Sequence, residues 1–367
     1  MCRHRWHGAI RLFQSSGSAC YLTTGDLRST NRDRARVHGE MVKDTAFPSR
    51  GALMVGFAHV AYCAAEEFAA RRTGVAHFEV RTLEELERRA READVLVVSG
   101  LWRNTLIAGA PKLRFVQSFS AGADQYDKAL FASRGIRLAS AQGVNERAVA
   151  EHAMALILAL TRQLHKARDN QRKRRWRAMI GDRAIREQEL GGRTLAIVGL
   201  GRIGKRLGRL ARAFDMRVIG VRRTERPAPE AADEVVAAAG LARAFAEADI
   251  VALTCPLTSE TEGLISAAAL HALKPGALLV NVAGGKVVDE AALLAALADG
   301  RVGAAALDCF PDEPLPPESP FWALPNVLIT PHSAGETGRY EATLVDILVD
   351  NIERLLRGES KLINEVV

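Results

Sequence analysis

The sequence predicts an α/β protein with two doubly wound domains, each built on a parallel sheet. Short apolar runs alternate with stretches of helical periodicity from about residue 53 to the C-terminus, the pattern of repeated strand–helix units. A glycine-rich turn near the middle of the chain joins one such strand to an amphipathic helix. The 367 residues, 48% hydrophobic and 25% charged, suffice for two domains with cores of their own.

The first domain is expected at 51–142, where a turn with the sequence SAGAD follows the fourth strand. An amphipathic segment at 336–357 follows the last strand of the second domain and has no partner there. We therefore expect it to return to the first domain, which then comprises 51–142 and 336–367. The predicted strands are 53–57, 77–80, 95–98, 115–118 and 136–138, and the predicted helices are 62–72, 83–90 and one that ends at Ser133.

The second domain is expected at 143–335 and begins with one helix at 146–171. The basic stretch RKRRWRAMI that follows is interpreted as a solvated loop, because it lacks stacking aromatic residues beyond Trp176. A proline-rich loop at 311–325 precedes the last strand. The predicted strands are 195–198, 216–221, 250–254, 277–283, 304–307 and 327–330, a sheet of six, and the predicted helices after the first are 203–214, 241–247, 266–273 and 290–297.

The turn GLGRIG has the spacing of a dinucleotide-binding turn. Gly199 would make the tight turn, Gly201 would let the backbone approach a pyrophosphate, and Gly204 would let the helix pack on the strand. Arg202 and Ile203 begin the helix, whose positive end attracts phosphate. A glycine turn without a ligand is the alternative.

The second strand of this unit ends at Arg222 and Arg223, where an acidic residue would bind the ribose 2′-hydroxyl of NAD. Guanidinium groups instead offer several donors to a 2′-phosphate. The sequence therefore favours NADP(H), with NAD possible. Alternatively, both arginines are the solvated ends of a polar loop.

Bulk properties exclude several classes of function. The five cysteines are scattered without a C-x-x-C pair, so neither disulfides nor a metal site are expected, and the reducing cytoplasm fits best. No apolar run of about 18 residues exists, so we expect no membrane insertion. The net charge of +7 is spread along the chain, apart from local clusters at 172–177 and 202–212, so no nucleic-acid partner is expected.

Residues 1–50 are rich in Arg, Ser, Thr and His without periodicity, and we predict a disordered extension. Its four acidic residues argue against an organelle transit peptide. Translation from Met41 or Met54 is an alternative that the sequence leaves open.

Over about 53–367 the chain resembles the D-isomer-specific 2-hydroxyacid dehydrogenases, and within them most resembles the glyoxylate and hydroxypyruvate reductases. The motifs that carry the resemblance are SAGAD, GVNERAVAEHA, GLGRIG, CPLTSET, VNVAGGKVVDE, LDCFPDEPLP and PHSAG, in this order. The resemblance implies Rossmann-like domains and hydride transfer between a nicotinamide and C2 of a short 2-oxo or 2-hydroxy acid, in the cleft between the domains. It also implies a homodimer formed through the cofactor domain.

The resemblance assigns the acid–base role to His332 and makes Glu313 its partner. Reduction of a carbonyl needs a proton at the oxygen, and imidazole is the side chain that titrates near neutrality. A carboxylate on the second ring nitrogen fixes the tautomer and favours the imidazolium. Without the family context, His332 would be a structural loop residue and Glu313 a solvated one.

The resemblance also assigns the binding residues. The backbone N–H groups of Ala121 and Gly122 would hold the substrate carboxylate, and Trp322 would wall the pocket, unless it only fills the core. Asp308 would bond the nicotinamide carboxamide. The remaining cofactor contacts would come from Thr254, Cys255, Pro256, Val282 and Ala283, with Cys255 as a packing residue and not a nucleophile.

One position departs from the family pattern N-x-A-R-G-x-x-V-D, because Gly284 stands where the arginine should be. That arginine binds the substrate's carboxylate and carbonyl, and losing a charge-assisted hydrogen bond costs about 1.5–3 kcal/mol. Three explanations are open. Lys286 could supply the missing charge, or the protein could bind the cofactor in a regulatory role without turnover. Alternatively, the codon for residue 284 in this gene copy could differ from an arginine codon by a single base. We expect an enzyme with impaired or altered activity.

Overall fold

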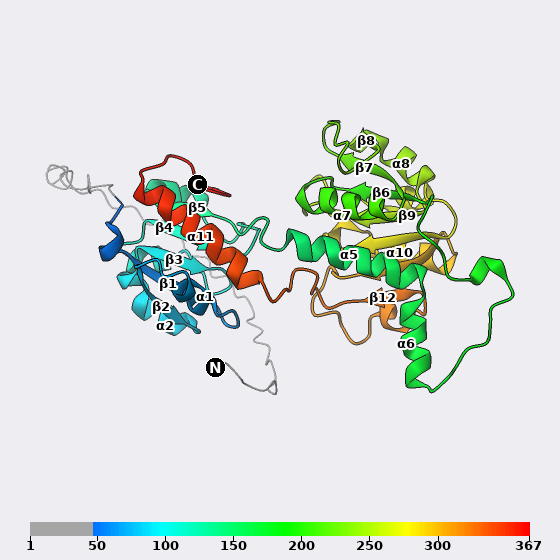
Figure 1. Ribbon diagram of the computed structural model, residues 1–367, viewed down its shortest axis with the longest axis horizontal. Coiled ribbons are helices and arrows are strands. Elements are labelled where there is room, and N and C mark those ends of the chain that lie inside the picture. Colours follow the sequence, from blue (N-terminus) through cyan, green and yellow to red (C-terminus); the bar gives the residue numbers. More distant parts are fainter. Residues whose placement is uncertain (1–46) are drawn as a thin grey trace, which may run out of the picture. The chain divides into compact units, whose positions relative to one another are not determined.

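A computed structural model describes residues 47–367, which contain two sheets of parallel strands with helices on their faces (Figure 1). The predicted α/β class with two doubly wound units is therefore confirmed. The first sheet has the strand order β2-β1-β3-β4-β5. Its strands are β1 (Met54–Ala58), β2 (Ala76–Val80), β3 (Val95–Val98), β4 (Phe115–Ser118) and β5 (Arg137–Ala139).

The helices of this part are short and begin at recognisable caps. The Thr82 side chain accepts from the Glu85 N–H at the start of α2, and Asp127 accepts from Leu130 at the start of α4. Strand β3 is buried along its length because helices cover both faces of a parallel sheet. The helices are α1 (Ala64–Ala70), α2 (Leu83–Arg89), α3 (Leu106–Gly109) and α4 (Lys128–Ser133).

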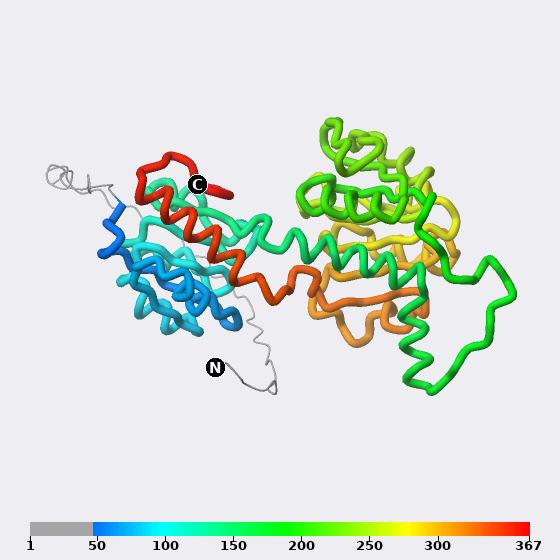
Figure 2. The backbone as a smooth tube through the Cα atoms, in the orientation of Figure 1, coloured from blue at the N-terminus to red at the C-terminus, as the bar shows by residue number. Residues whose placement is uncertain are grey.

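The last helix, α11 (Tyr340–Leu356), packs against α1 and the first sheet, although the two helices are far apart in sequence (Figure 2). Leu344, Leu348 and Ile352 lie in the same core cluster as the residues of β1. Arg71 also pairs with Asp346 at 2.8 Å. The expected assignment of 336–367 to the substrate domain agrees with this packing and remains a proposal about domain function.

The second sheet has the order β12-β11-β10-β9-β6-β7-β8, with every pair parallel. It has seven strands, because the short segment EVVA forms an edge strand, β8, that the sequence analysis missed. The strands are β6 (Thr194–Val198), β7 (Arg217–Arg222), β8 (Glu234–Ala237), β9 (Ile250–Leu253), β10 (Ala277–Asn281), β11 (Val302–Leu307) and β12 (Val327–Ile329).

The helix predicted at 146–171 is two helices in the structure, α5 (Glu146–Thr161) and α6 (Leu164–Arg172). Gln163 separates them with a left-handed φ of 51°. No glycine or proline marks this break, so the sequence pattern could not reveal it. The other helices are α7 (Arg202–Ala213), α8 (Leu241–Glu247), α9 (Ala267–His271) and α10 (Glu290–Ala298).

The packed chain begins before the predicted boundary at residue 51. Phe47 packs against the first core cluster, and Arg50 pairs with Glu353 at 2.7 Å. The predictions for residues 1–46, including disorder and a start at Met41, lie outside the described residues. Within the described range, no helix has the length and apolar character needed to cross a bilayer.

In each sheet the chain adds strands first on one side of the starting strand and then on the other. This topological switch point lies between β1 and β3 in the first sheet and between β6 and β9 in the second. Loops that leave the carboxyl ends of the strands diverge at such a point and leave a crevice. The fold therefore predicts where a ligand binds before any side chain is considered.

Candidate functional site

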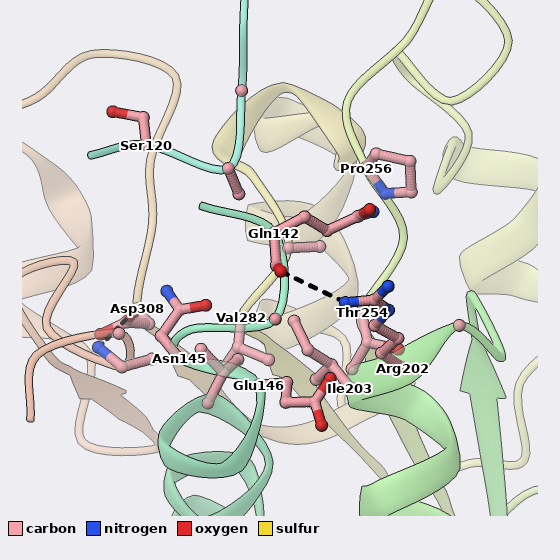
Figure 3. A pocket seen from close by; sticks show the side chains of 18 of the residues that line it. Ser120, Gln142, Asn145, Glu146, Arg202, Ile203, Thr254, Pro256, Val282 and Asp308 are labelled. Atoms are coloured by element: carbon pink, nitrogen blue, oxygen red, sulfur yellow. Dashed lines mark hydrogen bonds between the residues drawn. The ribbon is translucent and has the colours of Figure 1, made fainter. Parts of the chain in front are cut away.

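A cavity of about 690 Å³ lies where the loops at the carboxyl ends of the strands meet (Figure 3). Its lining comes from the segments that follow β1, β4, β5, β6, β9, β10, β11 and β12. The predicted residues that line it are Ala121, Gly122, Gly201, Arg202, Ile203, Thr254, Cys255, Pro256, Val282, Ala283, Asp308 and His332.

The glycine turn after β6 fits a bound pyrophosphate. Gly199 has φ +97°, and a Cβ atom there would lie 2.5 Å from the Cys255 backbone. A Cβ on Gly204 would lie 2.4 Å from the Gly199 carbonyl oxygen, so only glycine lets α7 pack this closely on β6. Nothing lies within 4 Å of a Cβ on Gly201, which leaves the turn open on the side where a phosphate would approach.

Arg202 is the first residue of α7 and projects into the cavity from the end of the glycine turn (Figure 3). Its guanidinium donates to the Gln142 carbonyl oxygen at 3.2 Å and to Asn364 Oδ1 at 3.3 Å. Both acceptors are uncharged, so Arg202 keeps its positive charge available to an anion at the helix N-terminus.

Arg222 and Arg223 lie at and just beyond the end of β7, the strand next to β6. Neither lines the cavity. The Arg223 side chain is 86% exposed and lies 4.0 Å from Glu260, a pairing that water screens. Both arginines lie beside the glycine turn, because Val198, which precedes the turn, is paired with Val221.

The loop at Ala121 and Gly122 offers donors to an anion. Among the hydrogen bonds of the described residues, neither backbone N–H has an acceptor. Below the loop, Ser99 Oγ lies 3.0 Å from Ser118 Oγ and 2.9 Å from Ser120 Oγ, and the Ser120 N–H donates to both Ser99 and Ser118. This network fixes Ser120, the residue that precedes the two free donors.

His332 and Glu313 form a hydrogen bond of 2.7 Å between Nδ1 and Oε2. The other oxygen of Glu313 accepts from the Phe310 N–H at 2.9 Å, which orients the carboxylate. His332 lines the cavity with φ +53°, a left-handed conformation that is uncommon for residues other than glycine. Because Nδ1 is bonded to a carboxylate, Nε2 is the nitrogen left for a substrate.

Asp308 is buried and accepts three hydrogen bonds within the protein. Its Oδ1 accepts from Thr330 Oγ1 at 2.6 Å and from the Ser333 N–H at 3.0 Å, and its Oδ2 accepts from the Ala334 N–H at 3.0 Å. The carboxylate therefore holds the chain on both sides of His332, a role that sequence analysis did not assign. Each oxygen has two lone pairs, so capacity remains for a carboxamide.

Trp322 lies apart from the cavity, contrary to the expected role as a pocket wall. Its side chain does not line the cavity, and its indole N–H donates to the Pro316 carbonyl oxygen at 2.9 Å. The residue is 55% exposed, so it does not fill the core either. The 3-10 helix at Pro320–Ala323 turns it outward, while the neighbouring Phe321 takes the buried position.

The two adjacent glycines after β10 differ in what they require. A Cβ on Gly285 would lie 1.8 Å from the Phe310 carbonyl carbon, so glycine is obligatory there. A Cβ on Gly284 would meet only Leu257 and Val287, at 3.7 and 3.8 Å, and its φ of 178° suits any residue. The fold would therefore accept an arginine at position 284. Lys286 is exposed and does not line the cavity.

Sequence reasoning missed several polar groups of the cavity, among them Tyr62, Asn145 and Glu336. The Tyr62 ring is stacked between His59, at 4.5 Å between centroids, and Tyr340, at 4.9 Å. Burial raises the pKa of Tyr62, with further contributions from Glu336 and Glu341, so its hydroxyl stays protonated at neutral pH. A lone tyrosine in a loop carries no motif by which it could have been found.

Comparison with known proteins agrees with this geometry. The NAD-binding domain of the D-isomer specific 2-hydroxyacid dehydrogenases matches residues 154–334. Glyoxylate reductase of Korarchaeum cryptofilum is 36% identical over 263 residues, 70% of this chain and 78% of that protein. Glyoxylate/hydroxypyruvate reductase B of Yersinia enterocolitica is 35% identical over 294 residues, 77% of this chain and 89% of that protein.

A solved structure shares the fold across most of the chain. It is a D-isomer specific 2-hydroxyacid dehydrogenase from Xanthobacter autotrophicus Py2 in complex with NADPH and MES. The TM-score is 0.71 at 28% identity, and the match covers 86% of this chain and 98% of that chain.

The two cysteines near the cavity are expected to be unreactive in the folded protein. Burial raises the pKa of Cys255, and burial next to Asp308 and Glu313 raises the pKa of Cys309 to about 12. At pH 8 the thiolate fraction of Cys309 is then about 10⁻⁴. Of the three cysteines in residues 47–367, iodoacetamide at pH 8 should label the half-buried Cys63 first and leave Cys255 and Cys309 intact, as peptide mass spectrometry would show.

The unfolded protein in guanidinium chloride is the control, in which all three thiols should react. Labelling of Cys309 in the native protein as fast as in the unfolded protein would contradict this assignment.

Proposed function

The chain belongs to the D-isomer specific 2-hydroxyacid dehydrogenase family, and from this premise we propose that it reduces short 2-oxo acids of the glyoxylate and hydroxypyruvate kind. The family is one of NAD(P)-dependent oxidoreductases that act on 2-hydroxy acids. The observation that carries the proposal is the 2.7 Å hydrogen bond between His332 and Glu313 at the wall of the cavity.

In this proposal His332 delivers the proton that carbonyl reduction consumes. Protonated Nε2 donates to the carbonyl oxygen, while Glu313 holds Nδ1 and so keeps the ring oriented. The free N–H groups of Ala121 and Gly122 bind the carboxylate of the substrate. A bound nicotinamide supplies the hydride to C2.

The cofactor is proposed to lie along the glycine turn with its phosphates at the N-terminus of α7. Gly201 gives the close approach, Arg202 adds a positive charge, and Ile203 packs against the nucleotide. Cys255, Pro256, Val282 and Ala283 complete this side of the cavity, and spare acceptor capacity on Asp308 suits the carboxamide. Arg222 and Arg223 support a preference for NADP over NAD.

The absent arginine supports lower activity than is usual for such an enzyme. With Gly284, Arg202 is the one arginine or lysine that lines the cavity among the described residues. The Tyr62 hydroxyl and the Asn145 amide remain as neutral polar groups. The same observation favours a second candidate function, a protein that binds the cofactor in a regulatory role without turnover.

Restoring the arginine tests which of the two functions applies. We expect Gly284→Arg to raise kcat/KM for glyoxylate or hydroxypyruvate by about tenfold or more, because a charged bidentate donor contributes at least 1.5 kcal/mol. The backbone conformation and the space at 284 accept the substitution. NADPH oxidation by wild type, Gly284→Arg and His332→Ala should be compared across a panel of short 2-oxo acids.

Gly284→Met is the matched control, because it fills the space without offering donors, and it should not gain activity. His332→Ala should abolish turnover in both backgrounds. Cofactor binding by wild-type protein with no turnover on any acid would instead favour the regulatory function.

The cofactor preference is tested at the end of β7. Replacing Arg222 and Arg223 together by alanine should raise the KM for NADPH about tenfold or more and leave that for NADH little changed, because only NADPH carries the 2′-phosphate. Arg226→Ala, in the same exposed loop, is the control. Equal losses with both cofactors would refute the preference.

We further propose that the protein forms a homodimer through α6 and the loop that follows it, up to Ile185. We also propose that the enzyme is cytoplasmic. This segment exposes Trp176 at 98%, Met179 at 97%, Ile185 at 61% and Leu164 at 54%. Exposed apolar residues gathered on one segment are typical of a protein interface. The free thiols Cys63, Cys255 and Cys309 suit a reducing compartment.

Light scattering after gel filtration tests the dimer. The wild-type protein should have twice the chain mass of 39.7 kDa, and Trp176→Asp with Met179→Asp should shift it to monomer. Val60→Asp, at an exposed apolar residue outside this segment, should leave the mass unchanged. A wild-type monomer would refute the proposal.

A further inference from the structure

The imidazole of His152 contacts the residues that hold the turn at His332, the candidate proton donor. It has no part in the chemistry described above. His152 is on α5, and its side chain is 23% exposed. Its Nε2 atom lies 3.1 Å from Thr330 Oγ1 and 3.5 Å from Asp308 Oδ1. One ring nitrogen is therefore aimed at the carboxylate that holds the chain on both sides of His332.

The direction of these hydrogen bonds follows from what each group can donate. The Asp308 carboxylate only accepts, so Thr330 Oγ1, at 2.6 Å, donates its single proton to Asp308. The Thr330 oxygen is then left to accept, and the partner within reach is the Nε2–H of His152. The chain of donors therefore runs from His152 through Thr330 to Asp308, with the His152 proton on Nε2.

This chain of donors holds a strained turn. His332 has φ +53°, and a left-handed conformation in a residue other than glycine is strained and persists only when its surroundings impose it. Asp308 binds Thr330 on one side of His332 and Ser333 and Ala334 on the other. The same carboxylate that His152 faces thus fixes the backbone from which the acid–base ring projects.

We propose that His152 is a positioning residue for His332. By donating to Thr330 it keeps the Thr330 hydroxyl turned toward Asp308, and Asp308 in turn holds the left-handed turn that presents His332 to the cavity. The inference rests on the proposed function, because the turn bears on the rate only if His332 delivers a proton. His152 itself does not touch the substrate.

Two substitutions separate the hydrogen bond from packing. His152→Leu removes the donor and keeps the bulk, whereas the amide nitrogen of His152→Gln reaches about the position of Nε2. We expect His152→Leu to lower kcat about tenfold with the KM for the cofactor little changed, the loss of roughly one hydrogen bond to a charged network. His152→Gln should recover most of the loss.

The neighbouring Glu151→Gln is the matched control. Glu151 is exposed, pairs with Arg147 on the surface of the same helix and should leave kcat unchanged. Thr330→Val should lower kcat as far as His152→Leu does, and the double variant should fall no further, because both substitutions break one chain. Additive losses would overturn the proposal.

Hydrogen exchange of the peptide that covers 330–335 gives a readout without turnover. The Ser333 and Ala334 N–H groups are bonded to Asp308, so His152→Leu should speed their exchange several-fold, while His152→Gln and Glu151→Gln should match wild type. If the wild-type protein binds cofactor but shows no turnover, the proposed function fails. The hydrogen-exchange rates then still show whether His152 holds the turn at His332. The positioning role would be refuted if His152→Leu had the same kcat and the same exchange rates as the wild-type protein. It would also be refuted if His152→Gln lost as much kcat as His152→Leu.

Discussion

The parallel direction of the strands is the constraint on which the candidate site depends. Because every strand runs parallel to its neighbours, the carboxyl ends of each sheet lie at one edge of that sheet, and loops far apart in sequence meet at the cavity. Tyr62, which follows β1, and His332, which follows β12, thus line one cavity. The helices make this possible by covering both faces of each sheet, so that only the edge is left for polar chemistry.

The carboxylates around His332 are held in pairs and networks of hydrogen bonds. Glu313 divides its oxygens between His332 and the Phe310 backbone, and buried Asp308 satisfies three donors. A buried carboxylate without such partners would be costly, so these groups also order the loops around them. The same hydrogen bonds that stabilise the turn after β12 therefore determine where its imidazole points.

The sequence predicted the fold and the family because both depend on periodicity and spacing, and comparison with known proteins confirms the two. It predicted the pairing of His332 with Glu313 through resemblance alone, and the 2.7 Å contact is consistent with it. The prediction from sequence failed where no residue type or pattern signals the local conformation. Gln163 breaks a helix without glycine or proline, β8 is only four residues long, and Trp322 turns outward because Phe321 occupies the core. The His152 contact joins residues 178 positions apart, and no pattern along the chain reports such proximity.

The unequal pair Gly284 and Gly285 has a consequence for the history of the gene. The backbone of Phe310 occupies the space beside Gly285, so that position is closed to change while the loop keeps its path. Position 284 is extended and has room, so a side chain can be lost or regained there without moving its neighbours. In evolution, position 284 can therefore gain or lose a charged side chain by one substitution, whereas position 285 must stay glycine.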